Sequence, residues 1–352
     1  MSLEFKTIED DREWDSLVQS LPKYSFLNSS CRYRFNLEVG SKSYRYAIYD
    51  KEAFLGIITL TIGYSKLFGN FLECKHSPLL FKYEYSTLEE ITEFCKNLAK
   101  ENNCFMFRFA PLIQENEDLE KFYNEHEFKK APIHNVDALI SQHMDLTLDI
   151  AELRHQLSSS RKNRLNKLLR DETVSVKIYN DKTAFDDFRK FHEETVALKG
   201  YTDKPTDILM KELSMQEEQG MCYMIVGCIE DKPISIWQAT VYGKNMHLYQ
   251  ACSSTEYREK NQIMTTLLYW KTVELGQSLH LETLDLFGGV VPKGWEHSSH
   301  PWSGISDFKE SLGGEKITYM HSRDYMLNKP KYWLYYWYSY IRTRKKGYTI
   351  DW

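Results

Sequence analysis

The order of expected elements in the first half of this chain recurs in the second half, and this repeat constrains the fold more than any other feature. LEFKTIEDDREWDSLVQSL (3–21) and VSVKIYNDKTAFDDFRKFHEE (174–194) each predict a short alternating strand, an acidic turn and an amphipathic helix. When the two are aligned, Asp10 falls on Asp181. Self-similarity of this kind indicates that one structural unit is present twice.

The later elements recur in the same order. YRYAIYDKEAFLGIITLTIGY (44–64) and CYMIVGCIEDKPISIWQATVYG (222–243) each predict two strands joined by an Asp-Lys turn. A helix followed by a strand comes next in each half, ending near residues 111 and 289. We therefore predict two copies of one α/β domain, the alternative being that any two α/β domains look alike at this level of detail.

Composition excludes several classes of protein. With 352 residues, of which 42% are hydrophobic and 27% charged, the chain is long enough for two globular domains. No apolar run approaches the ~20 residues that span a bilayer, and the N-terminus lacks a signal-peptide pattern. Seven scattered cysteines without a CxxC pair favour reduced thiols, so we expect a cytoplasmic protein. The net charge of −5 makes DNA an unexpected partner.

Two Gly-Gly turns flank a lysine near the end of the chain. DLFGG (285–289) reads as a strand end followed by a turn, and GISDFKESLGGE (304–315) carries Phe308 and Lys309 just before the second glycine pair. Paired glycines bring a backbone close to a ligand. Asp285 falls at the carboxyl edge of a sheet, where α/β folds bind ligands. It can equally be a turn-forming Asx residue.

A basic stretch and an aromatic tail are the other candidate binding features. RHQLSSSRKNRLNKLLR (154–170) has no acidic residue and has leucines near helical spacing, which indicates a cationic helix face for phosphates or, alternatively, an ordinary solvated face. The tail KPKYWLYYWYSYIRTRKKGYTIDW (329–352) suits either a membrane interface or a packed terminal helix. His297 and His300 have no further ligands nearby, so we expect no metal site.

Several segments carry a resemblance to a known family. They are YSFLNSSCRYRFNLEVG (24–40), KHSPLLF (75–81), the basic linker, the second hairpin, LDLFGG and ISDFKESLGGE. In this order and spacing they resemble the Fem family of peptidoglycan aminoacyltransferases, which are tandem GNAT-like proteins. The chain departs from the family pattern at Asn28, Ser77 and Lys199, where the family usually has Gln, Gly and Arg.

The resemblance implies an α/β fold of two tandem GNAT-like domains, each a mixed sheet flanked by helices, without a long coiled-coil insertion. The first domain would span 1–145 and the second, with the catalytic motifs, 146–325. The C-terminal helix, 326–352, would pack back on the first domain.

The resemblance also implies a reaction. The enzyme would move an amino acid from aminoacyl-tRNA to the stem-peptide amine of a UDP- or lipid-linked muropeptide, without a cofactor. Lys309 would stabilise the developing oxyanion, Phe308 would shape the site and Asp285 would hold an amine or orient a neighbour. The expected substrate-binding residues are Lys199, Tyr201, Tyr249, Gly288, Gly289, Arg161 and Arg164.

Two other functions remain open. An acyl-CoA-dependent N-acyltransferase of the same fold would need a Gly-containing turn for pyrophosphate, and YREKNQIMTTLLYW (257–270) has no glycine. A degenerate scaffold that only binds a partner is the third reading, and the intact LDLFGG and DFKESLGGE segments weigh against it. The tail adds a peripheral membrane contact as a further candidate partner.

Overall fold

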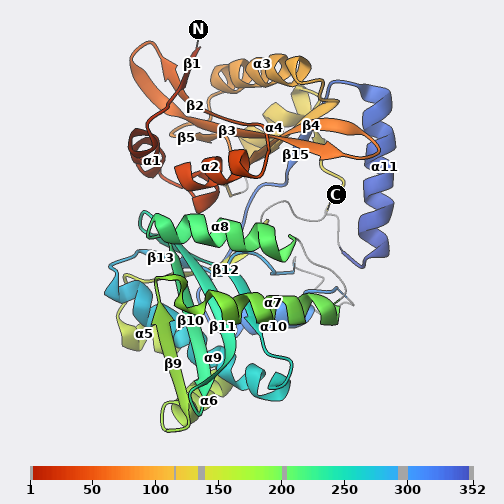
Figure 1. Ribbon diagram of the computed structural model, residues 1–352. Helices are drawn as coiled ribbons and strands as arrows, with labels where there is room; N and C mark the ends of the chain where they lie inside the picture. Colours follow the sequence, from red (N-terminus) through yellow and green to blue (C-terminus); the bar gives the residue numbers. More distant parts are fainter. Residues whose placement is uncertain (1–2, 115, 134–138, 200–203, 292–299, 349–352) are drawn as a thin grey trace. The chain divides into compact units, whose positions relative to one another are not determined.

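The computed structural model describes residues 3–114, 116–133, 139–199, 204–291 and 300–348. The chain forms two compact units, each with its own sheet and covering helices (Figure 1). One unit comprises Met1–Ile140, Val291–Ser303 and Ile317–Trp352, and the other comprises Ser141–Val290 and Gly304–Lys316.

The sheet of the first unit has the order β1-β2-β3-β4-β6-β15-β7, with β5 beside β3. Its strands are β1 (Leu3–Thr7), β2 (Ser43–Asp50), β3 (Ala53–Ser65), β4 (Gly69–Lys75), β5 (Leu79–Leu80), β6 (Met106–Ala110), β7 (Lys129–Lys130) and β15 (Arg323–Met326). Its helices are α1 (Asp11–Gln19), η1 (Phe26–Asn28), α2 (Ser30–Glu38), α3 (Tyr85–Glu101), α4 (Glu117–Glu125) and α11 (Lys329–Lys345).

The sheet of the second unit has the order β14-β8-β13-β12-β11-β10-β9. Its strands are β8 (Ile140–Asp145), β9 (Val174–Tyr179), β10 (Cys222–Ile229), β11 (Lys232–Tyr242), β12 (Asn245–Ser253), β13 (Thr283–Asp285) and β14 (Glu315–Thr318). Its helices are α5 (Ile150–Gln156), α6 (Ser159–Leu168), η2 (Lys182–Ala184), α7 (Phe185–Lys199), α8 (Thr206–Glu218), α9 (Arg258–Ser278) and α10 (Ser303–Glu310).

The two sheets repeat the same path. The order β1-β2-β3-β4-β6 in the first corresponds to β9-β10-β11-β12-β13 in the second, and in both the last of these strands pairs parallel with its neighbour. The next strand pairs antiparallel in each case, β15 on β6 and β8 on β13. Helices α3 and α9 occupy the same place in the order of elements.

The aligned aspartates begin equivalent helical segments. The Asp10 carboxylate accepts a hydrogen bond from the Glu13 amide at the start of α1. The Asp181 carboxylate accepts one from the Thr183 amide at the start of η2, which leads into α7. Both aspartates satisfy amides that a helix terminus leaves without partners, so the repeat extends to the caps.

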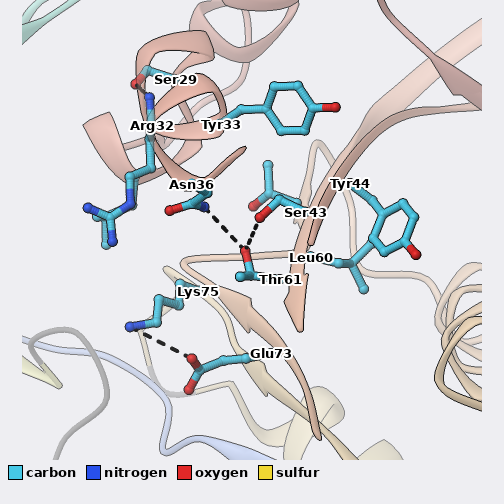
Figure 2. A pocket seen from close by; sticks show the side chains of 12 residues that line it. Ser29, Arg32, Tyr33, Asn36, Ser43, Tyr44, Leu60, Thr61, Glu73 and Lys75 are labelled. Carbon is cyan, nitrogen blue, oxygen red and sulfur yellow. Dashed lines mark hydrogen bonds and ion pairs between the residues drawn. The ribbon is translucent and has the colours of Figure 1, made fainter. Parts of the chain in front are cut away.

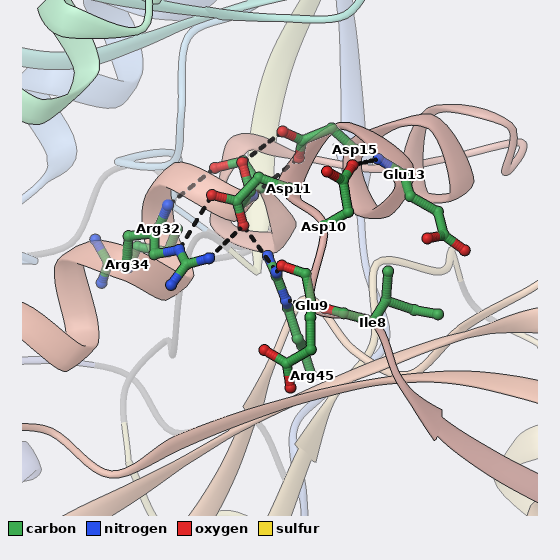
Figure 3. A network of polar contacts seen from close by, with 11 residues as sticks. Ile8, Glu9, Asp10, Asp11, Glu13, Asp15, Arg32, Arg34 and Arg45 are labelled. Carbon is green, nitrogen blue, oxygen red and sulfur yellow. Dashed lines mark hydrogen bonds and ion pairs between the residues drawn. The ribbon is translucent and has the colours of Figure 1, made fainter.

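A buried arginine fixes the start of α1 on the first sheet. Arg45 of β2 donates to the carbonyls of Ile8 and Glu9 at 2.9 Å and pairs with Asp11 at 2.7 Å (Figure 3). Arg34 of α2 joins the same carboxylate. Burial would raise the pKa of Asp11, but the bonds and charges of Arg34 and Arg45 outweigh burial and lower it.

Alternating side chains give the second sheet an apolar core on each face. Ile225 of β10 packs with α6 and α9, whereas its neighbours Met224 and Val226 pack with α7 and α8. Successive strand residues point to opposite faces, so a strand covered by helices on both sides is apolar throughout.

The unit boundaries differ from the expected 145 and 325. β8 pairs with β13 from His143 to Asp145 and so belongs to the second unit, and the chain divides between Ile140 and Ser141. β15 pairs with β6 and β7, so the chain returns to the first unit before the terminal helix begins. The expected helix over 326–352 is α11, and its buried face packs on Phe105 and Met106.

Candidate active site

Strands β12 and β13 of the second unit pair over a short stretch and then separate. Their parallel register joins Asn245 with Thr283 and ends at His247 with Asp285. β12 continues to Ser253, while the chain after Asp285 leaves the sheet as a turn. This carboxyl end of parallel strands is where α/β folds place ligands.

Asp285 is buried and holds the turn that follows it. Its Oδ1 accepts hydrogen bonds from the Ser141 hydroxyl and, at 2.7 Å, from the Phe287 amide. His143 Nε2 lies 3.4 Å from Oδ1, and His247 Nε2 lies 4.0 Å from Oδ2. Burial would raise the pKa of Asp285, but the charges of the two histidines when protonated, with the His143 and Ser141 hydrogen bonds, hold it well below its usual range.

The turn itself has an unusual backbone. Phe287, Gly288 and Gly289 have φ values of 50°, 72° and 70°, so three consecutive residues are left-handed. A Cβ on Gly289 would lie 3.2 Å from the Lys309 Nζ and 3.1 Å from Ile305. Glycine is therefore needed there for both its φ and its lack of a side chain. The Gly288 amide donates to Ser141 Oγ at 3.1 Å, which ties the turn to β8.

Lys309 of α10 reaches under this turn. Its ammonium donates to the Leu286 carbonyl at 2.6 Å and to the Gly288 carbonyl. An ammonium has three N–H donors, so one remains for a ligand oxygen. Burial lowers the pKa of Lys309 to about 8, against the opposing charge of Asp285. Lys309 therefore contacts the backbone of the first glycine turn directly.

Phe308 has different neighbours from Lys309 and anchors α10 through them. Its ring meets Trp237 edge-on at 6.2 Å, and the Arg161 guanidinium lies 4.7 Å from the ring centre. Arg161 also donates to Ser311 Oγ at 2.9 Å and to Thr266 Oγ1 at 3.0 Å. These contacts hold α6, α9 and α10 together.

Tyr249 of β12 lies beside the turn and belongs to a polar cluster. Its ring meets Phe287 edge-on at 5.6 Å. Its hydroxyl accepts from Lys204 Nζ at 2.5 Å and donates to Glu212 at 3.3 Å, while Lys204 also pairs with Glu212. Glu212 is buried in α8, so the cluster supplies its counter-charge.

The second glycine pair serves packing within the unit. Gly313 and Gly314 have φ values of 88° and 79°, as the sequence predicts for a turn at positive φ. A Cβ on Gly314 would lie 2.2 Å from the His143 carbonyl, and one on Gly313 would lie 2.8 Å from the Gln156 carbonyl. The close backbone approach expected of these glycines is therefore to β8 and α5.

The first unit has a small hollow with a cavity volume of about 60 Å³. Arg32 of α2 and Lys75 of β4 line it together with the hydroxyl residues Ser29, Thr59 and Thr61 (Figure 2). Lys75 lies 3.7 Å from Glu73 on the same wall. Cations among hydroxyl groups suit an anionic ligand that also carries hydroxyls, such as a sugar phosphate.

No protein-family model and no curated protein sequence matches the chain. The structure is similar to the crystal structure of FemX, with a TM-score of 0.81 at 13% identity, over 96% of this chain and 100% of that one. The chain has a FemX-like tandem GNAT fold. The sequence prediction of the fold is confirmed, and among the described residues no long helical hairpin interrupts the second unit.

More distant structures share this FemX-like fold. One is the C-terminal domain of a putative lysylphosphatidylglycerol synthetase from Agrobacterium fabrum, with a TM-score of 0.57 at 10% identity over 93% of this chain and 96% of that one. Another is a tandem GNAT protein from the clavulanic acid biosynthesis pathway, with a TM-score of 0.55 at 10% identity over 92% and 98% of the two chains.

Within the FemX-like fold, some expected site residues lie apart from the turn or outside the described part. Arg164 is exposed on α6. Tyr201 lies outside the described residues, as does the side chain of Lys199. His297 also lies outside them, and the described residues contain no group of three or more His, Cys, Asp or Glu side chains placed to hold a metal.

Sequence reasoning missed the residues that surround Asp285. His143 and His247 lie opposite Asp285 on the strands at either side, and Ser141 precedes His143 by two residues on β8. The pattern Ser-x-His in a strand places both side chains on one face. That signal points to a site only when the neighbour of β8 is known.

Proposed function

We propose that this chain is an acyltransferase that moves an amino acid from aminoacyl-tRNA to the stem-peptide amine of a peptidoglycan precursor. The observation that supports this proposal most directly is the position of the Lys309 ammonium. Two carbonyls of the turn accept hydrogen bonds from it, which leaves one N–H for a substrate oxygen. The FemX-like fold supports the reaction class. The donor screen described below would identify the amino acid that is transferred.

The proposed reaction is aminolysis of an ester. The acceptor amine nitrogen forms a bond to the ester carbonyl carbon, and the bond from that carbon to the ribose oxygen breaks. The proton lost by the amine balances the one gained by the departing ribose hydroxyl. Negative charge builds on the carbonyl oxygen between these events, and a fixed ammonium stabilises it more than it stabilises the ground state.

Asp285 acts in this proposal as a positioning residue. Its oxygen atoms accept from Ser141 and from the Phe287 amide, so it shapes the turn whose carbonyls hold Lys309. The Asx role is the one its contacts support. Arg161, packed on Phe308, likewise fixes α10, and Arg164 is exposed on α6.

The hollow of the first unit is the proposed place for the anionic part of the acceptor. Arg32 and the hydroxyls of Thr59 and Thr61 provide donors for a sugar diphosphate, whereas the Ser29 hydroxyl donates to the Phe26 carbonyl at 2.6 Å. An Arg32→Ala variant is then expected to raise the acceptor KM about tenfold while leaving the donor KM unchanged.

An acyl-CoA donor is the second candidate, because a tandem GNAT protein has the same fold. Pyrophosphate binds at helix starts that present bare amides. The residue that caps α3 is Glu84, whose carboxylate opposes an anion, and α9 begins after Tyr257 without a glycine. These starts favour the aminoacyl-tRNA donor.

A donor screen tests the proposal. The full chain is mixed with a UDP-linked muropeptide and with either a set of aminoacyl-tRNAs or acyl-CoAs, and the products are weighed by mass spectrometry. We expect one aminoacyl increment with charged tRNA. Product formed only with acyl-CoA would transfer the assignment to the second candidate, and no product with any donor would favour a binding scaffold.

Lys309→Met is the matching variant, with Lys316→Met as its control. Lys316 pairs with Glu310 at the surface, 2.8 Å away, and does not touch the turn. Loss of a fixed donor to an oxyanion lowers kcat about 10²- to 10³-fold. An unchanged kcat in Lys309→Met, with an intact fold, would refute the assigned role.

A further inference from the structure

Helix α11 presents apolar side chains on two faces. Its inner face, with Tyr332, Tyr335 and Tyr336, is buried against the first unit. Its outer face exposes large apolar residues, which are Trp333, Leu334, Trp337, Tyr338 and Ile341. Leu334 is 69% exposed and Trp337 is 53% exposed. Packing within the unit explains the inner face and leaves the outer face without a role.

The tip of the β3–β4 hairpin continues this outer face. Phe68 at the tip meets Tyr335 edge-on at 5.6 Å and Tyr338 at 5.6 Å, which fixes the hairpin against α11 (Figure 1). Beside it, Tyr64 is 71% exposed and Leu67 is 66% exposed. We call the outer face of α11 and this tip, Tyr64–Leu67, the apolar platform.

Basic residues surround the apolar platform. At 100° per residue, Lys345 falls on the same side of α11 as Leu334 and Ile341, whereas Arg342 falls at the edge of that side, about 80° from Leu334. Arg344 and Lys346 are exposed in the same last turn, and Lys66 lies within the hairpin tip. No Asp or Glu occurs between Lys329 and Gly347 or between Tyr64 and Asn70. This positive charge is local, because the whole chain has a net charge of −5.

We propose that the apolar platform binds the surface of a membrane rich in anionic lipid. Trp and Tyr side chains favour the bilayer interface, and adjacent Lys and Arg side chains attract anionic headgroups. The helix has 17 residues and a length of about 25 Å, and it would lie along the surface with its outer face inserted. None of the described helices is long and apolar enough to cross a bilayer.

Charge distinguishes this occupant from a second copy of the chain. A symmetric contact between two platforms would bring together two surfaces that both carry basic residues, with no Asp or Glu between Lys329 and Gly347 to pair with them. Such like-charge contacts oppose self-association, whereas an anionic lipid surface neutralises them. The proposal does not rest on the proposed aminoacyl transfer, since it concerns only where the first unit binds.

Vesicle flotation tests the proposal with the full chain. Vesicles of phosphatidylcholine alone are compared with vesicles containing about 30 mol% phosphatidylglycerol. We expect flotation with the anionic vesicles and its loss at about 0.5 M salt. We also expect tryptophan fluorescence to shift to the blue on binding, since Trp333 and Trp337 enter the interface.

Two double variants locate the contact. Leu334→Glu/Trp337→Glu should lower vesicle binding about a hundredfold, because both side chains are exposed and contribute through insertion. Arg342→Glu/Lys345→Glu should lower it about thirtyfold or more. The matched controls are Ile178→Glu, at an exposed apolar residue of β9, and Lys167→Glu/Arg170→Glu, at exposed cations within and just after α6. Neither control should alter binding.

Three outcomes would overturn the proposal. One is equal flotation with neutral and anionic vesicles, or no flotation with either kind. A second is binding that the platform variants leave intact while the Lys167→Glu/Arg170→Glu control abolishes it. The third is a dimer, measured by light scattering, that Leu334→Glu/Trp337→Glu dissociates, which would assign the platform to a second copy. Unchanged circular dichroism and an unchanged unfolding temperature would show that the platform variants remain folded.

Discussion

Arg108 and Asp324 form a bidentate ion pair inside the first unit although 216 residues separate them in the chain. The guanidinium donates to the two carboxylate oxygens at 2.6 and 2.8 Å. The hydroxyl of Tyr335 accepts from Arg108 at 3.1 Å, and that of Tyr332 donates to Asp324 at 3.1 Å. Through these contacts β6 holds both β15 and α11.

Asp324→Asn should therefore destabilise the protein. Removing one charge from a buried pair costs about 3–5 kcal/mol, and the Glu73 carboxylate, 3.9 Å from Arg108, places the expected loss at the lower end of that range. Urea unfolding followed by circular dichroism measures the free energy of unfolding. Asp231→Asn is the control, because Asp231 pairs with Lys177 at an exposed site and should change that energy by less than about 1 kcal/mol. Equal effects of the two variants would contradict the larger contribution to the free energy of unfolding that we assign to the buried pair.

The pH dependence of transfer should report Lys309. Its pKa is lowered to about 8, so it is mainly cationic at neutral pH and loses its charge as pH rises through that value. Because the proposed role needs the cation, kcat/KM, which reports the free enzyme, should fall above about pH 8. Lys309→Arg keeps its charge at higher pH and should remove this falling limb even if its rate is low. A limb that persists in Lys309→Arg would belong to another group.

Local signals explain how much of the fold was predictable. The duplication could be recognised because its signals depend on residues that are close together in the sequence. These signals are the aspartate caps at Asp10 and Asp181 and the alternation of Ile225 with its neighbours. The pairing of β15 with β6 joins segments far apart in the chain, and no local pattern specifies it. That is why the unit boundary was expected at 325.

The same distinction applies to the candidate site. Asp285, Gly288 and Lys309 lie in two short segments whose glycines mark a turn, and the structure joins them by hydrogen bonds. His143 and His247 could not be assigned because their relation to Asp285 depends on strand register. Register is a property of the assembled sheet.

Ser141→Ala should slow transfer through the turn. The Ser141 hydroxyl donates to Asp285 and accepts from the Gly288 amide, so its loss loosens the residues that hold Lys309. We expect kcat to fall about tenfold with KM nearly constant. We also expect the midpoint of the falling pH limb to move up, since a wetter ammonium has a higher pKa.

Ser278→Ala is the control for that variant. Ser278 donates to the Leu275 carbonyl at an exposed position at the end of α9. It should leave kcat and the pH limb unchanged. A general loss of stability in Ser141→Ala would lower the amount of active enzyme and leave the limb midpoint in place, which distinguishes a structural effect from the positioning role.

Glu212→Gln tests whether the cluster beside the turn is held by charge. Glu212 is buried and pairs with Lys204, and the Tyr249 hydroxyl bonds to both. Neutralising the carboxylate removes a charge-assisted contact, so the free energy of unfolding should fall by about 2 kcal/mol. Glu218→Gln, which breaks an exposed pair with Lys182, should change it by less than about 1 kcal/mol.

Tyr249→Phe then distinguishes support from substrate binding. If the Tyr249 hydroxyl only links Lys204 to Glu212, the variant should lose about 1 kcal/mol of stability and keep both KM values. If the hydroxyl exchanges its partners for a substrate phosphate or sugar, one KM should rise several-fold at constant kcat. Because Phe keeps the ring against Phe287, the turn stays packed, and steady-state kinetics with each substrate varied in turn separates the two results. We expect the loss of stability with both KM values unchanged, because the Tyr249 hydroxyl already bonds to the Lys204 ammonium and the Glu212 carboxylate.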